Sequence, residues 1–489
     1  MKRLVELVKG IPCEIHGNSK IDIKGIAYHS ARVESGYLFV AIDGFKQRGS
    51  DFIGEAANRG AAAVATTDVR NIHKSWVTGI TTAAPRRFLA QVANRYFDFP
   101  ARRLSLVGVT GTNGKTTTGY FLREMARKHG DEPGFMGTVE YWDGEERSKA
   151  VQTTPESLDF VGILDRLVSK GVKTCIAEVS SHALELDRTF DLDFKVAVFT
   201  NLSQDHLDFH KTFQAYRDAK MKLFTGLGPT SKAVLNFDDG MGRDIADKVR
   251  AKVVSYGLRD DLTPAPEVVG KVMRVYGRGI EVEVRHEGKA VPVRLRLAGR
   301  HNVMNLLAAY GAGTALGWPR EAIVDGAEAL VNVPGRLERL ENDRGFGVFV
   351  DYAHTPDALA RVLETVREFT DGKVIAVFGC GGDRDRDKRP KMGSTVAERA
   401  DVAVVTSDNP RSEEPQAIID QILQGMKNGA DMVVEPDRRQ AIATALGRAG
   451  KGDTVVIAGK GHEEYQLVGA ERLEFDDRKV AAELLKAAG

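Results

Sequence analysis

The sequence predicts an α/β protein of three domains, and three observations support this prediction. The chain has 489 residues, which corresponds to roughly three domains at about 150 residues each. Short apolar, β-branched runs alternate with helix-like segments, as in proteins whose parallel strands are joined by helices. Many of these runs end in polar or glycine-rich segments, and open α/β sheets bind their ligands at such strand ends.

The first segment, residues 1–100, predicts a small α/β domain. Strand-like runs lie at 37–42 and 61–66, and helix-like runs lie at 52–60 and 86–97. Residues 96–103, with Pro100, read as a linker, because the residue before a proline disfavours helix.

The second segment, residues 101–334, predicts a doubly wound sheet followed by an antiparallel hairpin. Buried parallel strands are expected at 104–110, 173–181, 195–203 and 232–239, with helical patterns between them. Residues 279–299 alternate apolar and polar side chains about a His-Glu-Gly turn, which is typical of a hairpin. A helix is expected at 302–316.

The third segment, residues 335–489, predicts a Rossmann-like α/β domain. Its four apolar runs lie at 347–350, 374–379, 402–407 and 454–459. Each leads into a polar or glycine-rich segment, so the chemistry of this domain is expected at the carboxyl ends of its strands.

The composition argues against several classes of protein. Hydrophobic residues make up 42% and charged residues 28%, as in ordinary globular proteins. The formal net charge of +1 argues against a dedicated nucleic-acid or membrane-surface binder. No apolar run approaches 18 residues and the N-terminus lacks the pattern of a signal peptide, so no membrane association is expected. Cys13, Cys175 and Cys380 are widely spaced, which fits a reduced protein in the cytoplasm.

The clearest motif is a phosphate-binding loop between the first strand and first helix of the second segment. It comprises Gly111, Thr112, Asn113, Gly114, Lys115, Thr116 and Thr117. Backbone N–H groups and the start of a helix bind anions there, while Lys115 would neutralise the β- and γ-phosphates and Thr116 would bind Mg²⁺. The usual spacing of the motif fails, because position 109 is Val and the nearest glycine is Gly108. The alternative is a glycine-rich turn without a ligand.

This loop resembles that of the Mur ligases and of their relative, folylpolyglutamate synthase. The resemblance covers essentially the whole chain, with TTPES at 153, EVSSHALE at 178, NLSQDHLDFH at 201, YRDAKMKLF at 216, GRHNVMNLLAA at 299, PGRLE at 334, DYAHTPD at 351 and DNPR at 408. It implies an ATP-dependent ligase of peptidoglycan synthesis. ATP would phosphorylate the D-glutamate side-chain carboxylate of UDP-MurNAc-L-Ala-D-Glu, and an amino group would then displace phosphate.

The resemblance also implies a role for each segment and a set of site residues. Residues 1–100 would bind the UDP-sugar, 101–334 ATP, and 335–489 the amino acid, in a monomer. Besides the loop, ATP would contact His301, Asn302, Asn305, Arg336 and Asp351. The UDP-MurNAc-dipeptide would contact Ser30, Thr153, Thr154, Ser180 and Arg188. The sequence departs from the family pattern beside these contacts, at His29, Ala31 and Leu186.

The metal site implied by the resemblance combines Thr116, Glu178, His206 and a carbamylated Lys220. The carbamate, which derives from CO₂, turns a cation into an anionic metal ligand, and its formation requires a neutral amine. Taken alone, Glu178 reads as a solvated carboxylate and His206 as a capping or packed histidine, and only their order with Lys115 in one α/β segment favours the metal site. Lys220 lies beside the apolar face of its helix and reads equally as a surface lysine.

DNPR indicates which amino acid is added. Arg411 offers a planar fork that fits a carboxylate, and the motif resembles that of family members that add meso-diaminopimelate, in which this arginine holds the distal carboxylate. The matching amino-acid contacts are Arg384, Asp408, Asn409, Pro410, Arg411, Gly459 and Glu463. The alternatives are a plain turn at DNPR, L-lysine as the substrate, a folylpolyglutamate-synthase-like ligase, and a nucleotide-dependent switch without catalysis.

Overall fold

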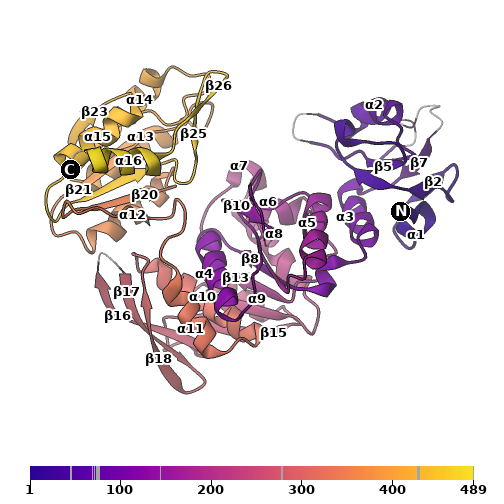
Figure 1. Cartoon of the computed structure of the whole chain (residues 1–489), viewed down its shortest axis with the longest axis horizontal. Helices are drawn as coiled ribbons and strands as arrows, with labels where there is room; N and C mark the ends of the chain where they lie inside the picture. The colour runs from indigo at the N-terminus through magenta and orange to yellow at the C-terminus, as the bar shows by residue number, and fades with distance from the viewer. Residues whose placement is uncertain are drawn as a thin grey trace. The chain divides into compact units, whose positions relative to one another are not determined.

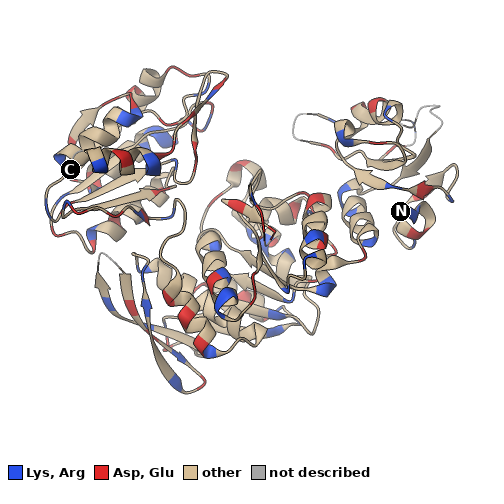
Figure 2. Ribbon diagram, viewed as in Figure 1, with Lys and Arg blue, Asp and Glu red and all other residues tan. Residues whose placement is uncertain are grey.

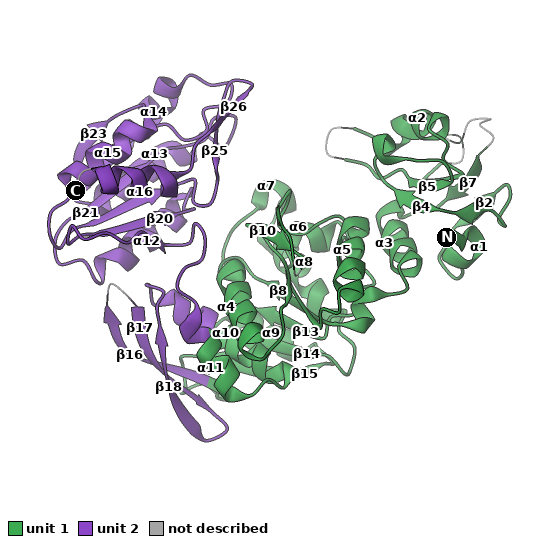
Figure 3. Ribbon diagram, in the orientation of Figure 1, with its two compact units in different colours: residues 1–268, 307–326 green, residues 269–306, 327–489 purple. Residues whose placement is uncertain are grey.

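The computed structural model describes residues 1–44, 47–68, 70, 72, 77–143, 145–276, 279–426 and 430–487 (Figure 1). The chain forms two compact units (Figure 3). Unit 1 comprises residues 1–268 and 307–326, and unit 2 comprises residues 269–306 and 327–489. Lys and Arg are interspersed with Asp and Glu over the helices of both units, as the near-neutral charge suggests (Figure 2).

The N-terminal part of unit 1 is a five-stranded sheet between helices. The strand order is β2 (Glu14–His16), β7 (Thr78–Thr81), β6 (Ala63–Thr66), β5 (Tyr37–Val40) and β4 (Gly25–Ala27), and only β2 is antiparallel to its neighbour. A separate pair joins β1 (Lys2–Arg3) to β3 (Asp22–Ile23). Helices α1 (Leu4–Leu7) and α3 (Pro85–Tyr96) share one core with the sheet, and α2 (Ile53–Asn58) shares the other. Successive β5 residues such as Leu38 and Phe39 point to opposite faces of the sheet and enter the two different cores. The strands and helices predicted for this part of the chain are confirmed.

The central sheet of unit 1 places the phosphate-loop strand in its middle. The parallel order is β9 (Gly134–Met136), β12 (Thr174–Glu178), β8 (Ser105–Thr110), β13 (Val196–Phe199), β14 (Lys232–Asn236) and β15 (Lys252–Gly257). Antiparallel β10 (Glu140–Trp142) and β11 (Arg147–Lys149) extend its edge. The carboxyl ends of β12, β8 and β13 are therefore neighbours, and the four predicted parallel strands are confirmed.

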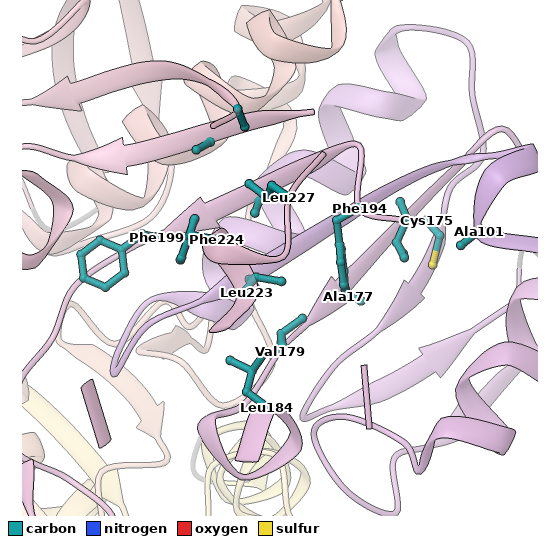
Figure 4. Packing of buried hydrophobic residues seen from close by; sticks show 14 of the residues in the cluster. Ala101, Cys175, Ala177, Val179, Leu184, Phe194, Phe199, Leu223, Phe224 and Leu227 are labelled. Atoms are coloured by element: carbon teal, nitrogen blue, oxygen red, sulfur yellow. The ribbon is translucent and has the colours of Figure 1, made fainter. Parts of the chain in front are cut away.

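Helices cover this sheet and supply its core. They are α4 (Lys115–Lys128), α5 (Ser157–Ser169), α6 (Ser181–Glu185), α7 (Leu207–His210), α8 (Phe213–Thr225), α9 (Gly240–Ala246), α11 (Arg320–Ala329) and the second part of α10 (His301–Leu316), with a 3₁₀ turn at Pro100–Arg103 in the predicted linker. Phe194, Phe199, Leu223, Phe224 and Leu227 belong to one buried cluster, in which the ring centres of Phe199 and Phe224 lie 6.3 Å apart (Figure 4). None of the described helices is at once long and apolar enough to span a bilayer.

Unit 2 begins with the predicted antiparallel hairpin. Strands β16 (Val268–Tyr276), β17 (Gly279–His286) and β18 (Lys289–Leu295) are adjacent, and β17 pairs with β18 from Ile280–Leu295 to His286–Lys289. Glu287 and Gly288 form the two-residue turn with φ of 51° and 72°. Positive φ at both turn positions matches the right-handed twist of the strands, so the predicted turn is confirmed.

The C-terminal sheet of unit 2 has helices on both faces. Its order is β19 (Glu338–Arg339), β20 (Gly347–Asp351), β24 (Thr454–Ala458), β21 (Val374–Phe378), β22 (Val402–Val405) and β23 (Asp431–Val434), parallel except for β19. Helices α12 (Pro356–Arg367), α13 (Lys388–Arg399) and α14 (Pro415–Leu423) belong to one core, and α15 (Arg438–Arg448) and α16 (Asp477–Ala487) to the other. The four predicted strands are confirmed. The sequence analysis missed β19 and β23 and the hairpin of β25 (Tyr465–Val468) and β26 (Glu471–Glu474), which lack long apolar runs.

Candidate active site

The loop between β8 and α4 has the geometry of an anion cradle. Gly111 adopts a φ of 150°, and a Cβ there would lie 1.8 Å from Thr200 Oγ1, so only glycine fits. Asn201 Oδ1 accepts from the Asn113 N–H at 3.0 Å, and Thr200 Oγ1 donates to the Asn113 carbonyl at 2.6 Å. The two residues that follow β13 therefore fix the conformation of the loop. The loop places the N-terminus of the 14-residue helix α4 at the edge of the sheet.

Lys115, the first residue of α4, lies over this loop. Its Nζ donates to the carbonyls of Gly111 and Thr112, both at 2.9 Å. The ammonium group is therefore already located at the cradle where an anionic ligand would bind. This placement agrees with the role that the sequence predicts for Lys115.

Glu178 ends β12, is fully buried, and lies beside Thr116. Its Oε2 accepts from Thr116 Oγ1 at 3.1 Å and from Thr138 Oγ1 at 3.0 Å, while its Oε1 accepts from the Thr138 N–H at 3.0 Å. The structure therefore brings two of the predicted metal ligands together, as hard oxygen atoms of the kind that Mg²⁺ prefers. The sequence analysis missed Thr138, which belongs to no motif that it recognised.

Lys220 is buried in α8, 1% exposed, so it is not the surface lysine that the local pattern also allowed. Its Nζ donates to the Gly111 carbonyl at 2.8 Å and lies 4.6 Å from the centre of the Tyr216 ring. Burial, and then the nearby charge of Lys115, lower the pKa of Lys220 well below its ordinary value. The amine is thereby favoured in its neutral, nucleophilic form.

His206 lies at the N-terminus of α7 with a φ of 53°. Its Nε2 is 3.6 Å from an oxygen of Asp205, and its ring centre is 4.9 Å from that of His182. Burial is the main cause that lowers the pKa of His206, and the charges of Lys115 and Lys220 act in the same direction. A neutral imidazole suits metal binding. Among the described residues, however, no three His, Cys, Asp or Glu side chains form a ready metal cluster.

Four of the five predicted dipeptide contacts gather beside Glu178. Thr154 Oγ1 donates to the Glu178 carbonyl at 2.8 Å and accepts from the Ser180 N–H at 3.0 Å. Thr153 Oγ1 lies 3.1 Å from Thr138 Oγ1, and Arg188 donates to the Thr154 carbonyl at 3.1 Å. Polar groups that suit a carboxylate therefore surround the candidate metal ligand.

The fifth residue, Ser30, lies in the N-terminal part and donates to Glu55 at 2.8 Å. The sequence analysis missed a cavity of about 430 Å³ at the carboxyl ends of β5 and β6. Its lining residues are Ala41, Asp43, Arg48, Ser50, Thr66, Thr67 and Asp68. Arg86 donates to the Asp43 carbonyl at 2.9 Å and to buried Glu156 at 2.6 Å. Glu156 lies 3.5 Å from Arg188, so Arg86 connects this region with one of the predicted dipeptide contacts.

The predicted nucleotide contacts of unit 2 lie at two strand and helix ends. Asn302 donates to the Ala298 carbonyl at 2.7 Å and accepts from the Asn305 amide at 2.9 Å, so both amides anchor the start of α10, while His301 is exposed. Asp351 ends β20 and accepts from the N–H groups of Leu337 and Ala353 at 2.6 and 2.8 Å. Burial raises the pKa of Asp351.

Arg336 lies in the turn that Asp351 holds. Its guanidinium carbon is 5.3 Å from the centre of the Tyr352 ring. Its buried Nε–H donates to no acceptor among the described residues. Such a donor suits an anionic ligand, as the sequence analysis expects of this arginine.

The predicted amino-acid contacts converge from three strand ends. The Asn409 amide donates to Glu463 at 2.9 Å, which joins the end of β22 to the end of β24. Gly459 packs against Asp408, whose Oδ2 would lie 2.7 Å from a Cβ at position 459. A Cβ on Gly381, after β21, would meet Arg411 at 2.9 Å and Arg384 at 3.8 Å. These contacts place both arginines beside the same turn, and Pro410 lies between Asn409 and Arg411.

Backbone bonds hold Arg411 in an unusual conformation. Its φ is 52°, in the left-handed region that favours glycine. The Arg411 N–H donates to the Leu467 carbonyl at 3.0 Å, and its carbonyl accepts from the Gly469 N–H at 2.7 Å. The guanidinium donates to the Gly382 carbonyl at 2.7 Å. The β25–β26 hairpin, which the sequence analysis missed, therefore positions the residue that it singled out.

A buried arginine outside the predicted set also supports this site. Arg389 is fully buried and donates to both carboxylate oxygens of Glu413 at 3.0 and 2.9 Å. Glu413 also accepts from the Asp383 N–H at 2.7 Å. The hydrogen bonds with Arg389 are the main cause that lowers the pKa of Glu413 to about 2. This pair ties the segment after DNPR to the loop that carries Arg384.

Comparisons of this chain with known proteins agree with the family resemblance that the sequence motifs predict. Three family descriptions cover the chain: "Mur ligase family, catalytic domain" at residues 22–98, "Mur ligase middle domain" at 109–313, and "Mur ligase, glutamate ligase domain" at 335–461. The UDP-N-acetylmuramoyl-L-alanyl-D-glutamate--2,6-diaminopimelate ligase of Caldanaerobacter subterraneus subsp. tengcongensis is 41% identical over 485 residues, 99% of both chains. The chain belongs to the Mur ligase family. The predicted resemblance is thereby confirmed.

Two further Mur ligases support the assignment. The ligase of the same name from Geobacillus kaustophilus is 41% identical over 499 residues, 100% of both chains. A solved structure entitled "Structure of UDP-N-acetylmuramoyl-L-alanyl-D-glutamate--2, 6-diaminopimelate ligase" superposes with a TM-score of 0.72 at 32% identity, covering 100% of this chain and 99% of the other. The predicted fold class of three α/β domains is confirmed.

A buried ion pair supports the C-terminal sheet of this Mur ligase. The side chains of Arg438 and Asp477 are fully buried. Arg438 Nε and Nη2 donate to the two carboxylate oxygens of Asp477, each at 2.7 Å. Arg438 also donates to the carbonyls of Ser407 and Ala458 at 3.2 and 3.0 Å. These carbonyls lie at the ends of β22 and β24, so the pair joins the two strand ends that carry Asn409 and Glu463.

We expect Asp477→Ala to lower the free energy of unfolding by about 3–5 kcal/mol, because it leaves a buried guanidinium without its counter-charge. Denaturant-induced unfolding measures this loss. The matched control is Arg439→Ala, which removes an exposed pair with Glu483 and should cost less than about 1 kcal/mol. An equal, small loss in both variants would contradict the expectation.

Proposed function

We propose that this Mur ligase joins meso-2,6-diaminopimelate to the D-glutamate side-chain carboxylate of UDP-MurNAc-L-Ala-D-Glu, with ATP as co-substrate, in peptidoglycan synthesis. The observation that carries the proposal is the full-length identity of 41% to ligases of that name. The convergence of arginine and acidic side chains at Asn409 and Glu463 supports it, because diaminopimelate carries carboxylate and ammonium groups at both ends. Residues 1–100, 101–334 and 335–489 are proposed to serve UDP-sugar, ATP and amino acid, respectively.

In the first step the substrate carboxylate attacks the γ-phosphorus of ATP, the bond to the β-phosphate oxygen breaks, and ADP leaves. The loop Gly111–Thr117 and Lys115 bind and neutralise the phosphates, so that the carboxylate can approach in line. Thr153, Thr154, Ser180 and Arg188 orient the dipeptide carboxylate beside Glu178. Thr116, Glu178, His206 and carbamylated Lys220 would hold Mg²⁺, which when bound neutralises phosphate charge.

In the second step the amino group of diaminopimelate attacks the acyl phosphate, phosphate leaves, and the amine loses its proton. Arg411 and Arg384 are proposed to bind the distal carboxylate, while Asp408, Asn409 and Glu463 orient the ammonium group, with Gly459 leaving space for Asp408. His301, Asn302, Asn305, Arg336 and Asp351 are proposed to contact the nucleotide. Ser30 and the cavity at β5 and β6 are proposed to receive the UDP end. We expect a monomer that acts in the cytoplasm and supports cell growth and division.

The experiment that tests the function is phosphate release from ATP with UDP-MurNAc-L-Ala-D-Glu, with and without an amino acid. We expect release that depends on meso-diaminopimelate, together with a product whose mass equals the dipeptide plus diaminopimelate less water. L-Lysine is the second candidate substrate, because it offers the same attacking amine. Release with lysine alone would favour that candidate, and ATP binding without release in any mixture would favour a switch.

We further propose that Lys220 carries a carbamate. Its lowered pKa makes the neutral amine available at a lower pH than in free lysine, so CO₂ can add near neutral pH. Activity should fall at least ~10-fold in CO₂-free buffer, the scale of losing support at a metal site, and bicarbonate should restore it. Lys220→Ala should be inactive with or without bicarbonate. Lys222→Ala, on the same helix and paired with Glu185 at the surface, should behave like the wild type.

A further inference from the structure

Lys460 is a fully buried lysine in the amino-acid site to which the proposed function gives no role. It follows β24 between Gly459 and Gly461. Its Nζ donates to Asn409 Oδ1 at 3.2 Å, to Glu463 Oε2 at 3.1 Å and to the Tyr465 carbonyl. An ammonium group has three N–H donors, so all three are used within the protein and none is left for a ligand.

These bonds determine how Asn409 and Glu463 are presented. Asn409 Oδ1 also accepts from the Leu467 N–H at 2.9 Å, which directs its Nδ2 to Glu463 Oε2 at 2.9 Å. Both bonds to Glu463 thus end on Oε2. In the described parts of the chain no hydrogen bond reaches Oε1, and the Glu463 side chain is 19% exposed. Among the described residues, the protein therefore holds one carboxylate oxygen, Oε2, on a side chain that remains partly exposed.

We propose that Lys460 is a positioning residue that fixes Glu463, directly and through Asn409, for the ammonium group of the incoming amino acid. The proposal rests on the proposed function, because that function supplies the amino acid. Burying a lysine and a carboxylate is costly, and apolar residues of similar size often replace such pairs without loss of stability. The buried charge therefore indicates a task beyond stability, and its bond to the partly exposed Glu463 side chain points to the placement of that carboxylate.

The test compares KM values in Lys460→Met, which keeps an unbranched apolar stem and removes the ammonium group. We expect KM for meso-diaminopimelate to rise about tenfold or more, as for a lost hydrogen bond to a charged group, while KM for ATP stays within about twofold of the wild type. The matched control is Val456→Ala, which leaves a cavity in the β24 core without touching the site. If Val456→Ala raises KM for the amino acid equally, the role of Lys460 is merely structural and the proposal fails.

A double-mutant cycle supplies a second readout. Glu463→Gln should raise KM for the amino acid strongly in the wild type and little in Lys460→Met, because the two residues act as a unit. Additive effects, or an unchanged KM in Lys460→Met, would overturn the proposal. Lys460→Gln, which keeps a donor, replaces the methionine variant if that one does not fold. Failure of the wild type to ligate diaminopimelate would instead contradict the proposed function.

Discussion

Lys115→Ala should reduce ligation by at least ~10³-fold, which is the upper range for removing one group that stabilises transition-state charge. Lys115 is the first residue of α4, and its ammonium group lies at the Gly111 and Thr112 carbonyls, inside the cradle of backbone N–H groups. Transfer of the γ-phosphoryl group spreads negative charge over the phosphate oxygens, and a positioned cation lowers the energy of that state. Phosphate release with all three substrates present measures the effect.

The control for this variant is Lys128→Ala, at the exposed end of the same helix. It removes the same kind of side chain far from the cradle and should retain wild-type activity. Thermal unfolding of both variants shows whether a loss of activity reflects a loss of stability. If Lys115→Ala ligates at the wild-type rate, the phosphate loop does not serve catalysis and the proposed mechanism is wrong.

Arg411→Ala should lower kcat/KM for meso-diaminopimelate by roughly 10–100-fold, because each charge-assisted hydrogen bond to a carboxylate is worth about 1.5–3 kcal/mol. Any activity with L-lysine should change less than about threefold, because lysine has no distal carboxylate for the guanidinium to bind. Steady-state kinetics with the two amino acids measure this difference. The effect should lie mainly in KM, since the arginine binds a part of the substrate that does not react.

Arg439→Ala is the matched control for Arg411→Ala. Arg439 lies in the same unit, on α15, and pairs with Glu483 at the surface. Its removal should leave kcat/KM for both amino acids unchanged. An equal loss of diaminopimelate and lysine activity in Arg411→Ala would show that the residue supports the DNPR turn rather than distinguishing the substrates.

The sequence was sufficient to predict the buried parallel strands with long apolar runs and the phosphate loop, because both depend on local pattern. Buried parallel strands are continuous apolar runs, and the turn at Glu287 and Gly288 follows from backbone preferences within two residues. The predicted site residues were found in short motifs that resemble those of the Mur ligases, many of them at strand ends. The motifs did not reveal their neighbours, and Thr138 and Lys460 became visible only through the hydrogen bonds that they make to Glu178 and Glu463.

The sequence by itself determined the α/β class, the order of the strands and helices that it predicted, and the segments in which chemistry is expected. Only the tertiary structure decided that β24 lies between β20 and β21, which brings the end of a late strand beside DNPR. It also decided that Lys220 is buried against the Gly111 carbonyl, where its local pattern allowed a surface position. Strand order and burial arise from packing between residues far apart along the chain, and local periodicity carries no record of those partners.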